Sequence, residues 1–385
     1  MKAQLVHEYN NTVQVDRWLA PTIHHNNIDG MFIQISDGLP TQYEVKFINK
    51  KNNIVEYLTT ITNDCWAKTS VKYYVDWKVE VRDVHSSYKF EYDFTLQDKM
   101  VHISIESDSL GDTLAWIPSI ESFRQQHGCK IVCSTKWKHL FEKEYTDITF
   151  VSPETIVNDV YAKYRLGLYY NQDNSINFNL MPLFPLNRPL QQWAADILGV
   201  EHVERKPKLT HPEVNEVDEK LITIALHSTT QAKYWNNPTG WQKVVDWLVA
   251  RGYTVKLLSR EHDNYMGNPH PTGIIQHPES PIESVMVELK RSKLFIGLGS
   301  GLSWLSWALG TPTLIISGFS DPISEMQDCV RITAPKDVCS GCFNRSRLIA
   351  TDWNWCPDFK NTPRQYECTK NITGEMVIKE LEKLL

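Results

Sequence analysis

The N-terminal quarter of the chain alternates apolar and polar side chains over short segments. This alternation occurs in Met31–Ile35, Tyr43–Phe47, Lys72–Val81 and Tyr88–Phe94. A period of two residues is typical of strands that bury one face. Turn-forming pairs rich in Gly, Asn and Asp separate the segments. The pattern predicts an antiparallel β domain over residues 1–98, either a sandwich or a barrel.

From residue 99 the apolar positions form short continuous segments that alternate with helical ones. Val101–Ile105 and Lys130–Cys133 are predicted strands, and Thr113–His127 between them is a predicted helix. A strand, a helix and a second strand form the parallel βαβ unit. We predict a Rossmann-like lobe over residues 99–205, which ends in a Pro- and Leu-rich stretch containing one helix, Leu190–Leu198.

The same alternation of strands and helices returns in residues 206–335 and predicts a second Rossmann-like lobe. The predicted strands are Leu221–Leu226, Thr254–Leu258, Leu294–Gly297 and Thr313–Ser317, and the predicted helices are Thr239–Arg251, Pro281–Arg291 and Ser303–Leu309. Apolar strands without alternation are typical of parallel sheets that helices cover on both faces. The fold class is therefore α/β. The cleft at the carboxyl ends of the strands, between the lobes, is the expected ligand site.

Composition and charge exclude several classes of function. The chain has 385 residues and a formal net charge of −6, which argues against a general nucleic-acid binder. No apolar run approaches the roughly 18 residues of a membrane-spanning helix. The residues after Met1 lack the apolar run of a signal peptide. We expect a cytoplasmic protein that neither spans a membrane nor binds nucleic acid.

Four of the eight cysteines gather in residues 336–385, which we predict to be a metal finger followed by a C-terminal helix. They are Cys339, Cys342, Cys356 and Cys368. A Cys-x2-Cys turn followed by two further cysteines suits a closed tetrahedral metal site, which is structural rather than catalytic. The chemistry favours zinc first and an iron tetrathiolate second. Two disulfides or four unrelated thiols are the alternatives, and disulfides are uncommon in the cytosol.

Asp112 is the candidate catalytic residue. It follows Gly111 at the predicted turn from the first strand to the first helix of its lobe. A carboxylate at a helix N-terminus stays ionised because the exposed N–H groups stabilise its charge. There it can accept a proton from an attacking hydroxyl within about 3 Å. It can equally be an ordinary helix cap.

Residues after two strands of the second lobe are candidate ligands of a nucleotide. Lys233, with Thr229 and Thr230, follows the first strand of this lobe and suits a diphosphate, although a solvated loop is the alternative. Glu261, just past the next strand, is a candidate for contact with ribose or adenine.

A glycine-rich loop precedes the last predicted helix of the second lobe. Its candidate donor-binding residues are Gly299, Ser300, Gly301, Leu302 and Ser303. Backbone N–H groups that converge at a helix N-terminus form a natural phosphate site. The loop matches neither the P-loop nor the dinucleotide-binding fingerprint, so it does not by itself indicate an NTPase or a dehydrogenase.

These motifs together resemble a known family. Residues 110–114, the Lys233 loop and residues 297–312 resemble GT-B sugar transferases of the ADP-heptose:lipopolysaccharide heptosyltransferase superfamily. The β domain and the four cysteines narrow the resemblance to the bacterial autotransporter heptosyltransferases. The lipopolysaccharide enzymes commonly carry an aspartate where this chain has Gly299, so no role for such a side chain carries over.

The resemblance implies a GT-B protein O-heptosyltransferase. It would move heptose from ADP-heptose to serine hydroxyls of an autotransporter adhesin passenger. It implies that Asp112 is the general base, and that Lys233 and the Ser300–Ser303 loop hold the diphosphate without Mg²⁺. It further implies one Fe³⁺ per subunit on the four cysteines and assembly into a dodecameric ring.

Two other functions are compatible with the sequence. One is a lipopolysaccharide core heptosyltransferase, whose acceptor is a lipid saccharide. The other is a nucleotide-sugar-binding assembly scaffold without turnover. The β domain and the cysteine-rich tail favour a protein acceptor and a multimer over the lipid acceptor.

Overall fold

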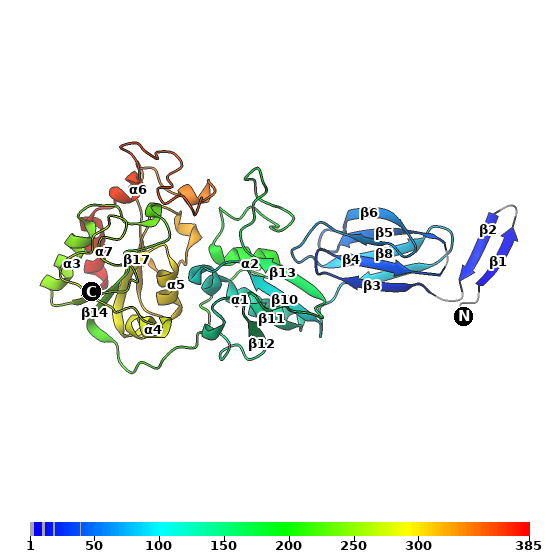
Figure 1. The fold of residues 1–385 in the computed structure, drawn as a ribbon, viewed down its shortest axis with the longest axis horizontal. Coiled ribbons are helices and arrows are strands. Elements are labelled where there is room, and N and C mark those ends of the chain that lie inside the picture. Colours follow the sequence, from blue (N-terminus) through cyan, green and yellow to red (C-terminus); the bar gives the residue numbers. More distant parts are fainter. Residues whose placement is uncertain (1–3, 10–11, 18–19, 39) are drawn as a thin grey trace.

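The computed structural model describes residues 4–9, 12–17, 20–38 and 40–385. Three parts follow one another along its longest axis (Figure 1). The N-terminal strands lie at one end, an α/β lobe lies in the middle, and a second α/β lobe with the C-terminal tail lies at the other end. The site described below lies where the two lobes meet.

In its described residues, the N-terminal part is entirely antiparallel, as predicted. It consists of a hairpin, a three-stranded sheet and a four-stranded sheet. The strands are β1 (Gln4–Tyr9) and β2 (Thr12–Arg17) in the hairpin, β3 (Thr22–Asn26), β4 (Phe32–Ser36) and β7 (Trp66–Lys68) in the first sheet, and β6 (Ile54–Thr62), β5 (Gln42–Asn49), β8 (Trp77–Asp83) and β9 (Lys89–Asp93) in the second.

Alternate side chains of β4, β5 and β8 are buried in one core, which makes the two sheets a sandwich. Val45 and Phe47 of β5 are buried there, with Val79 of β8 and Ile33 of β4. Strand β8 begins at Trp77, so the prediction that it starts at Lys72 is wrong. Strand β6 was not predicted, because its apolar residues do not alternate and most remain exposed.

The middle lobe contains a four-stranded parallel sheet in the order β12-β11-β10-β13. Its elements are β10 (Met100–Ile105), α1 (Leu110–His127), β11 (Lys130–Ser134), η1 (Lys138–Leu140), β12 (Ile148–Val151), β13 (Ala162–Leu166) and α2 (Leu190–Leu198). Helix α2 has the predicted bounds. Helix α1 begins at Leu110, three residues before the prediction, so Asp112 lies inside its first turn rather than in a preceding turn.

The second lobe contains a six-stranded parallel sheet in the order β16-β15-β14-β17-β18-β19. Its elements are β14 (Asp218–Ile224), η2 (Gln231–Lys233), α3 (Gly240–Ala250), β15 (Thr254–Leu257), β16 (Ile275–Gln276), α4 (Ile282–Arg291), β17 (Ser292–Leu298), α5 (Gly301–Ala308), β18 (Thr313–Ile316), η3 (Pro322–Ser324) and β19 (Val330–Ile332). The prediction that β18 is the last strand is wrong, because β19 adds one more strand at the edge.

The tail contains η4 (Cys342–Asn344), α6 (Glu367–Lys370) and α7 (Gly374–Leu384). Helix α7 packs against α3, and its Val377 and Leu381 are fully buried in the core of the second lobe. The Trp235 indole N–H donates to the Ile372 carbonyl at 2.7 Å. The tail therefore folds back onto the second lobe and completes its core.

No helix in the described ranges combines the length and the apolar character that a membrane crossing requires.

Candidate active site

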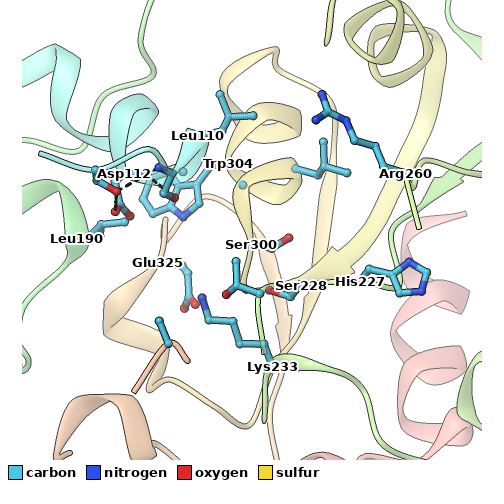
Figure 2. Close-up of a pocket in the computed structure, with 18 of the residues that line it drawn as sticks. Leu110, Asp112, Leu190, His227, Ser228, Lys233, Arg260, Ser300, Trp304 and Glu325 are labelled. Carbon is cyan, nitrogen blue, oxygen red and sulfur yellow. Dashed lines mark hydrogen bonds between the residues drawn. The ribbon is translucent and has the colours of Figure 1, made fainter. Parts of the chain in front are cut away.

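A cleft of about 860 Å³ separates the two lobes. Its walls come from the carboxyl ends of β10, β14, β15 and β17, from the first turns of α1 and α5, and from the tail. Figure 2 shows Asp112 on the side of the middle lobe, with Lys233, Ser228 and Ser300 on the side of the second lobe. The structure thus brings most of the candidate residues of both lobes to one cavity, at the expected edge of the sheets, with Thr230 and Ser303 as the exceptions.

Asp112 occupies the third position of helix α1. Ser109 caps the helix, and its hydroxyl accepts a hydrogen bond from the Asp112 backbone N–H at 3.4 Å. The Ser107 hydroxyl donates to Asp112 Oδ2 at 2.6 Å. Ser107 therefore holds the carboxylate, Ser109 holds the backbone that carries it, and the carboxylate lines the cleft. The capping role that was the alternative for Asp112 belongs to Ser109.

The charge of Asp112 depends on competing influences. Burial raises the pKa of Asp112, while the hydrogen bond from Ser107 and the positive charge of Lys233 lower it. Burial dominates, so this carboxylate is more basic than a solvated aspartate. We expect a helix N-terminus to favour the ionised form, but burial has the largest influence on the pKa of Asp112. A carboxylate of raised pKa is better suited to accept a proton.

The first turns of α1 and α5 approach each other closely at the base of the cleft. A Cβ atom on Gly111 would lie 3.0 Å from Trp304 Cδ1, and a Cβ atom on Gly301 would lie 3.2 Å from Leu110 Cβ. The two backbones nearly touch, so a larger residue at either glycine would force its neighbours to shift. Trp304 and Trp307 of α5 are buried, and Trp304 also contributes to the cleft wall.

Lys233 ends the short helix η2 and extends toward the cleft (Figure 2). Its ammonium lies 5.2 Å from the centre of the Phe319 ring. Burial lowers the pKa of Lys233, and the negative charges of Asp112 and Glu325 raise it. Lys233 is therefore part of the cleft wall and not the exposed lysine of a solvated loop.

The tail holds the loop that carries Lys233. The Trp353 carbonyl accepts hydrogen bonds from the Thr230 hydroxyl and from the Gln231 backbone N–H, each at 3.1 Å. Thr230 is 1% exposed and does not reach the cleft, so the prediction that its hydroxyl binds the donor is not supported. Thr229 does line the cleft. Trp353 lines the cleft as well, a role that its position among the cysteines did not indicate.

The glycine-rich loop leads into α5 with an uncapped first turn. Ser300 is the N-cap in extended conformation, and its side chain makes no capping hydrogen bond. The first N–H groups of a helix have no partner within it, so those of Gly301 and Leu302 are suited to an anion. The Ser303 hydroxyl is fully buried and donates to the Leu298 carbonyl at 2.5 Å. Ser303 therefore cannot serve as the predicted donor ligand in this arrangement.

Glu261 belongs to a hydrogen-bonded chain at the far side of the cleft. The Ser259 hydroxyl donates to Glu261 Oε2 at 2.6 Å, and His227 Nδ1 lies 2.6 Å from the same hydroxyl. Burial lowers the pKa of His227 to about 4, so this ring is neutral at physiological pH. Sequence reasoning did not single out His227, although its position directly after a strand of the sheet was a usable signal.

Glu325 is a further cleft residue that the sequence did not reveal. It is 7% exposed and lines the cleft beside Lys233 and Gly299. It follows η3 in a loop without a recognisable motif. Only the return of this loop to the carboxyl end of β17 brings it to the site.

The four cysteines of the tail lie near one another. Cys342, Cys356 and Cys368 are buried, and Cys339 is half-buried. Burial, with a contribution from neighbouring cysteines, raises the pKa of Cys339 and of Cys368 to about 12. Across the described ranges, however, no group of three or more His, Cys, Asp or Glu side chains is arranged as a metal site. The thiols are gathered, but the predicted tetrahedron is not formed.

Comparison with known proteins gives consistent results. The family model for glycosyltransferase family 9 (heptosyltransferase) matches residues 181–326. The autotransporter heptosyltransferase BAHTCr of Citrobacter rodentium is 35% identical over 359 residues, which are 91% of this chain and 86% of that protein. The autotransporter heptosyltransferase Aah of Escherichia coli is 33% identical over 375 residues, 93% of each chain.

The structure is also similar to that of TibC, an iron-containing dodecameric glycosyltransferase from enterotoxigenic Escherichia coli. The TM-score is 0.85 at 31% sequence identity, covering 94% of this chain and 95% of TibC. TibC has also been crystallised in complex with ADP-D-β-D-heptose, and that structure matches with the same TM-score over 95% of this chain and 97% of TibC.

Proposed function

Because the chain belongs to the autotransporter heptosyltransferases, we propose that it transfers heptose from ADP-heptose to serine hydroxyls of an autotransporter passenger. It is a glycosyltransferase with the α/β fold of this enzyme class. One observation in this structure supports the proposal independently of the family: Asp112 of one lobe and Lys233 of the other line the same cleft. That arrangement supports a mechanism in which a base and a cation act on opposite sides of one substrate.

The donor binds on the side of the second lobe. Lys233 and the free N–H groups of Gly301 and Leu302 hold the diphosphate, with Ser300 and Thr229 at its edge. Glu261, which lines the cleft, accepts hydrogen bonds from the ribose hydroxyls in this proposal. The hydroxyls of Thr230 and Ser303 are not part of this set, because both are bonded within the fold.

The acceptor serine approaches from the side of Asp112. Asp112 removes the proton from the serine hydroxyl while the serine oxygen bonds to the anomeric carbon of the heptose. The bond between that carbon and the diphosphate oxygen breaks, and ADP leaves with the electron pair. Lys233 and the α5 amides stabilise the departing charge, so the reaction proceeds without Mg²⁺. Activity that persists in EDTA supports this step, and strict dependence on added Mg²⁺ contradicts it.

The four cysteines hold one Fe³⁺ per subunit in a structural site. Two observations support this: the similar TibC contains iron, and the thiols of this chain act on one another electrostatically, with Cys342 and Cys356 buried in a cluster with Phe319, Trp355 and Tyr366. Four thiolates are a soft donor set that suits iron or zinc, and a cation would offset their mutual repulsion. When bound, the metal stabilises the tail, whose Trp353 holds the Lys233 loop.

Elemental analysis of the purified protein tests the metal assignment. We expect about one iron per chain in the wild type and none in Cys356→Ser, with the exposed Cys65 replaced by Ser as the matched control. Zinc in place of iron, or iron retained in Cys356→Ser, contradicts the assignment.

We also propose that the protein assembles as a dodecamer, as TibC does. The molar mass in solution, measured by light scattering, tests this directly. A monomer or dimer at working concentration contradicts it.

The experiment that tests the function is a reconstituted reaction. Purified enzyme is incubated with ADP-heptose and a purified autotransporter passenger from the same genome, and the passenger is weighed by intact-protein mass spectrometry. Successive additions of one heptose, mapped to serines, are expected. Transfer to lipopolysaccharide core alone favours the lipid-acceptor enzyme. Binding of ADP-heptose without transfer to either acceptor favours the scaffold.

A further inference from the structure

A second acidic side chain, Glu325, faces Lys233 across the donor side of the cleft. Figure 2 shows the carboxylate and the ammonium directed toward each other. Glu325 is 7% exposed, and its negative charge raises the pKa of Lys233 against the effect of burial. The mechanism described above assigns it no role.

The carboxylate of Glu325 is held rigidly on its far side. The Ser320 hydroxyl donates to Oε1 at 2.7 Å. Arg331 of β19 forms an ion pair with Oε2, and both of these side chains are only 9% exposed. A carboxylate fixed at both oxygens keeps one position, and it still presents Oε1 toward the cleft.

Glu325 Oε1 lies in the space that a side chain at position 299 would occupy. A Cβ atom on Gly299 would lie 2.6 Å from Glu325 Oε1. Gly299 does not adopt the left-handed backbone conformation that favours glycine, so the reason for glycine there is space. The Glu325 carboxylate fills the volume into which a side chain at position 299 would project.

The Lys233 ammonium is attracted by two carboxylates, so its position in the cleft depends on the balance between them. The negative charges that act on it are those of Asp112 and Glu325. Among the described residues, no carboxylate lies within 4.0 Å of its ammonium. Without Glu325 the ammonium would be drawn toward Asp112, which would remove both the cation from the diphosphate and the free base from the acceptor.

We propose that Glu325 is a positioning residue that holds the Lys233 ammonium on the α5 side of the cleft, away from Asp112, in place of the side chain that Gly299 lacks. This inference rests on the proposed role of Lys233 in binding the diphosphate. It makes the donor site depend on a loop outside the glycine-rich motif.

Moving the carboxylate from position 325 to position 299 tests the proposal. Glu325→Gln, which removes the charge but not the bulk, should lower kcat/KM for heptose transfer about tenfold or more, the size of one charge-assisted contact. Glu325→Ala should do the same. Gly299→Asp in the Glu325→Ala background should restore most of the loss, because the new carboxylate enters the vacated space. Gly299→Asp alone should impair transfer, because its Cβ would meet Glu325 Oε1.

Three controls keep the outcomes distinct. Thermal unfolding of each variant separates a loss of fold from a loss of positioning. If Glu325→Gln does not fold because Arg331 is left unpaired, Glu325→Gln with Arg331→Met removes both buried charges and is assayed instead. Glu288→Gln removes another carboxylate with a lysine partner, on α4 and outside the cleft, and should change stability only.

Two results would overturn the proposal. One is wild-type kcat/KM in a folded Glu325→Gln enzyme. The other is a double variant, Gly299→Asp with Glu325→Ala, that folds and is no better than Glu325→Ala. Lys233→Ala separates this failure from that of the proposed function: if Lys233→Ala binds ADP as the wild type does, the assignment of Lys233 itself is wrong.

Discussion

Two helices begin at the same cleft, one from each lobe, and their first turns differ in one essential respect. Helix α1 carries its own negative charge there, because Asp112 lies in the first turn and Ser109 caps the backbone. Helix α5 carries none, because Ser300 makes no capping hydrogen bond and Ser303 is turned toward the Leu298 carbonyl. The N-terminus of a helix favours negative charge in either case.

This difference in charge suggests a different role for each helix in the cleft. In the proposed mechanism, α1 supplies the anion, Asp112, as a base toward the acceptor. On α5 the position is left for the anion of a ligand, and Lys233 lies beside it. The two helices nearly touch at Gly111 and Gly301, so base and phosphate site are held at a fixed separation. Similar strand–glycine–helix segments thus differ in charge through the residues of the first turn, and the proposed mechanism gives them opposite functions.

The largest expected effect follows from removing the anion of α1. Asp112→Asn should lower the rate of heptose transfer about 10²–10⁴-fold, the usual contribution of a general base. The affinity for ADP should remain close to that of the wild type. Single-turnover transfer and calorimetry with ADP measure the two quantities. Asp108→Asn, an exposed aspartate of the same loop that pairs with Lys136, is the matched control. A rate within a few-fold of the wild type would remove Asp112 from the role.

The second-largest effect is expected when the N-terminus of α5 receives a negative charge, as α1 has with Asp112. Ser300→Asp should cap the open first turn and repel the diphosphate, weakening ADP binding about tenfold or more, since a hydrogen bond to a charged group contributes about 1.5–3 kcal/mol. Ser300→Asn caps the turn without a charge and should have a smaller effect. Calorimetry with ADP measures both. Equal affinities in the two variants would show that charge at this position is irrelevant.

A smaller effect is expected where the two helices meet. Gly111→Ala places a methyl group 3.0 Å from Trp304 Cδ1 and should cost about 1–3 kcal/mol of stability, as overpacking commonly does. Urea unfolding measures the change in free energy. A fully stable variant would mean that the lobes separate easily at this point and that the fixed spacing is not enforced there.

The smallest effect concerns the cap of α1. Ser109→Ala removes the acceptor of the Asp112 N–H and should cost about 1 kcal/mol of unfolding free energy. Transfer should change little, because Ser107 still holds the carboxylate. A large loss of transfer with unchanged stability would assign Ser109 a direct part in the chemistry.

The sequence predicted the regular elements well where pattern alone decides them. The alternation in β4 and β5 and the bounds of α2 agree with the structure. The prediction failed where tertiary contacts determine the bounds or the existence of an element. Strand β6 keeps its apolar residues exposed, and α1 starts early because Ser109 rather than a later residue caps it.

For the site, the sequence predicted which strand ends would meet, but not the direction of individual side chains. Asp112 and Lys233 reach the cleft, whereas the hydroxyls of Thr230 and Ser303 turn to backbone carbonyls. Such a choice between ligand and carbonyl depends on the local backbone, which residue type does not reveal. Glu325 and Trp353 come from irregular loops, and only the folding of those loops over the second lobe brings them to the cleft.

A crystal structure of this protein with ADP-heptose is the most direct test of the division between the two helices. The account predicts that the diphosphate lies on the Gly301 and Leu302 amides beside Lys233, with the anomeric carbon facing Asp112 across a gap that a serine hydroxyl can enter. A diphosphate bound elsewhere in the cleft, or an anomeric carbon turned away from Asp112, would contradict it.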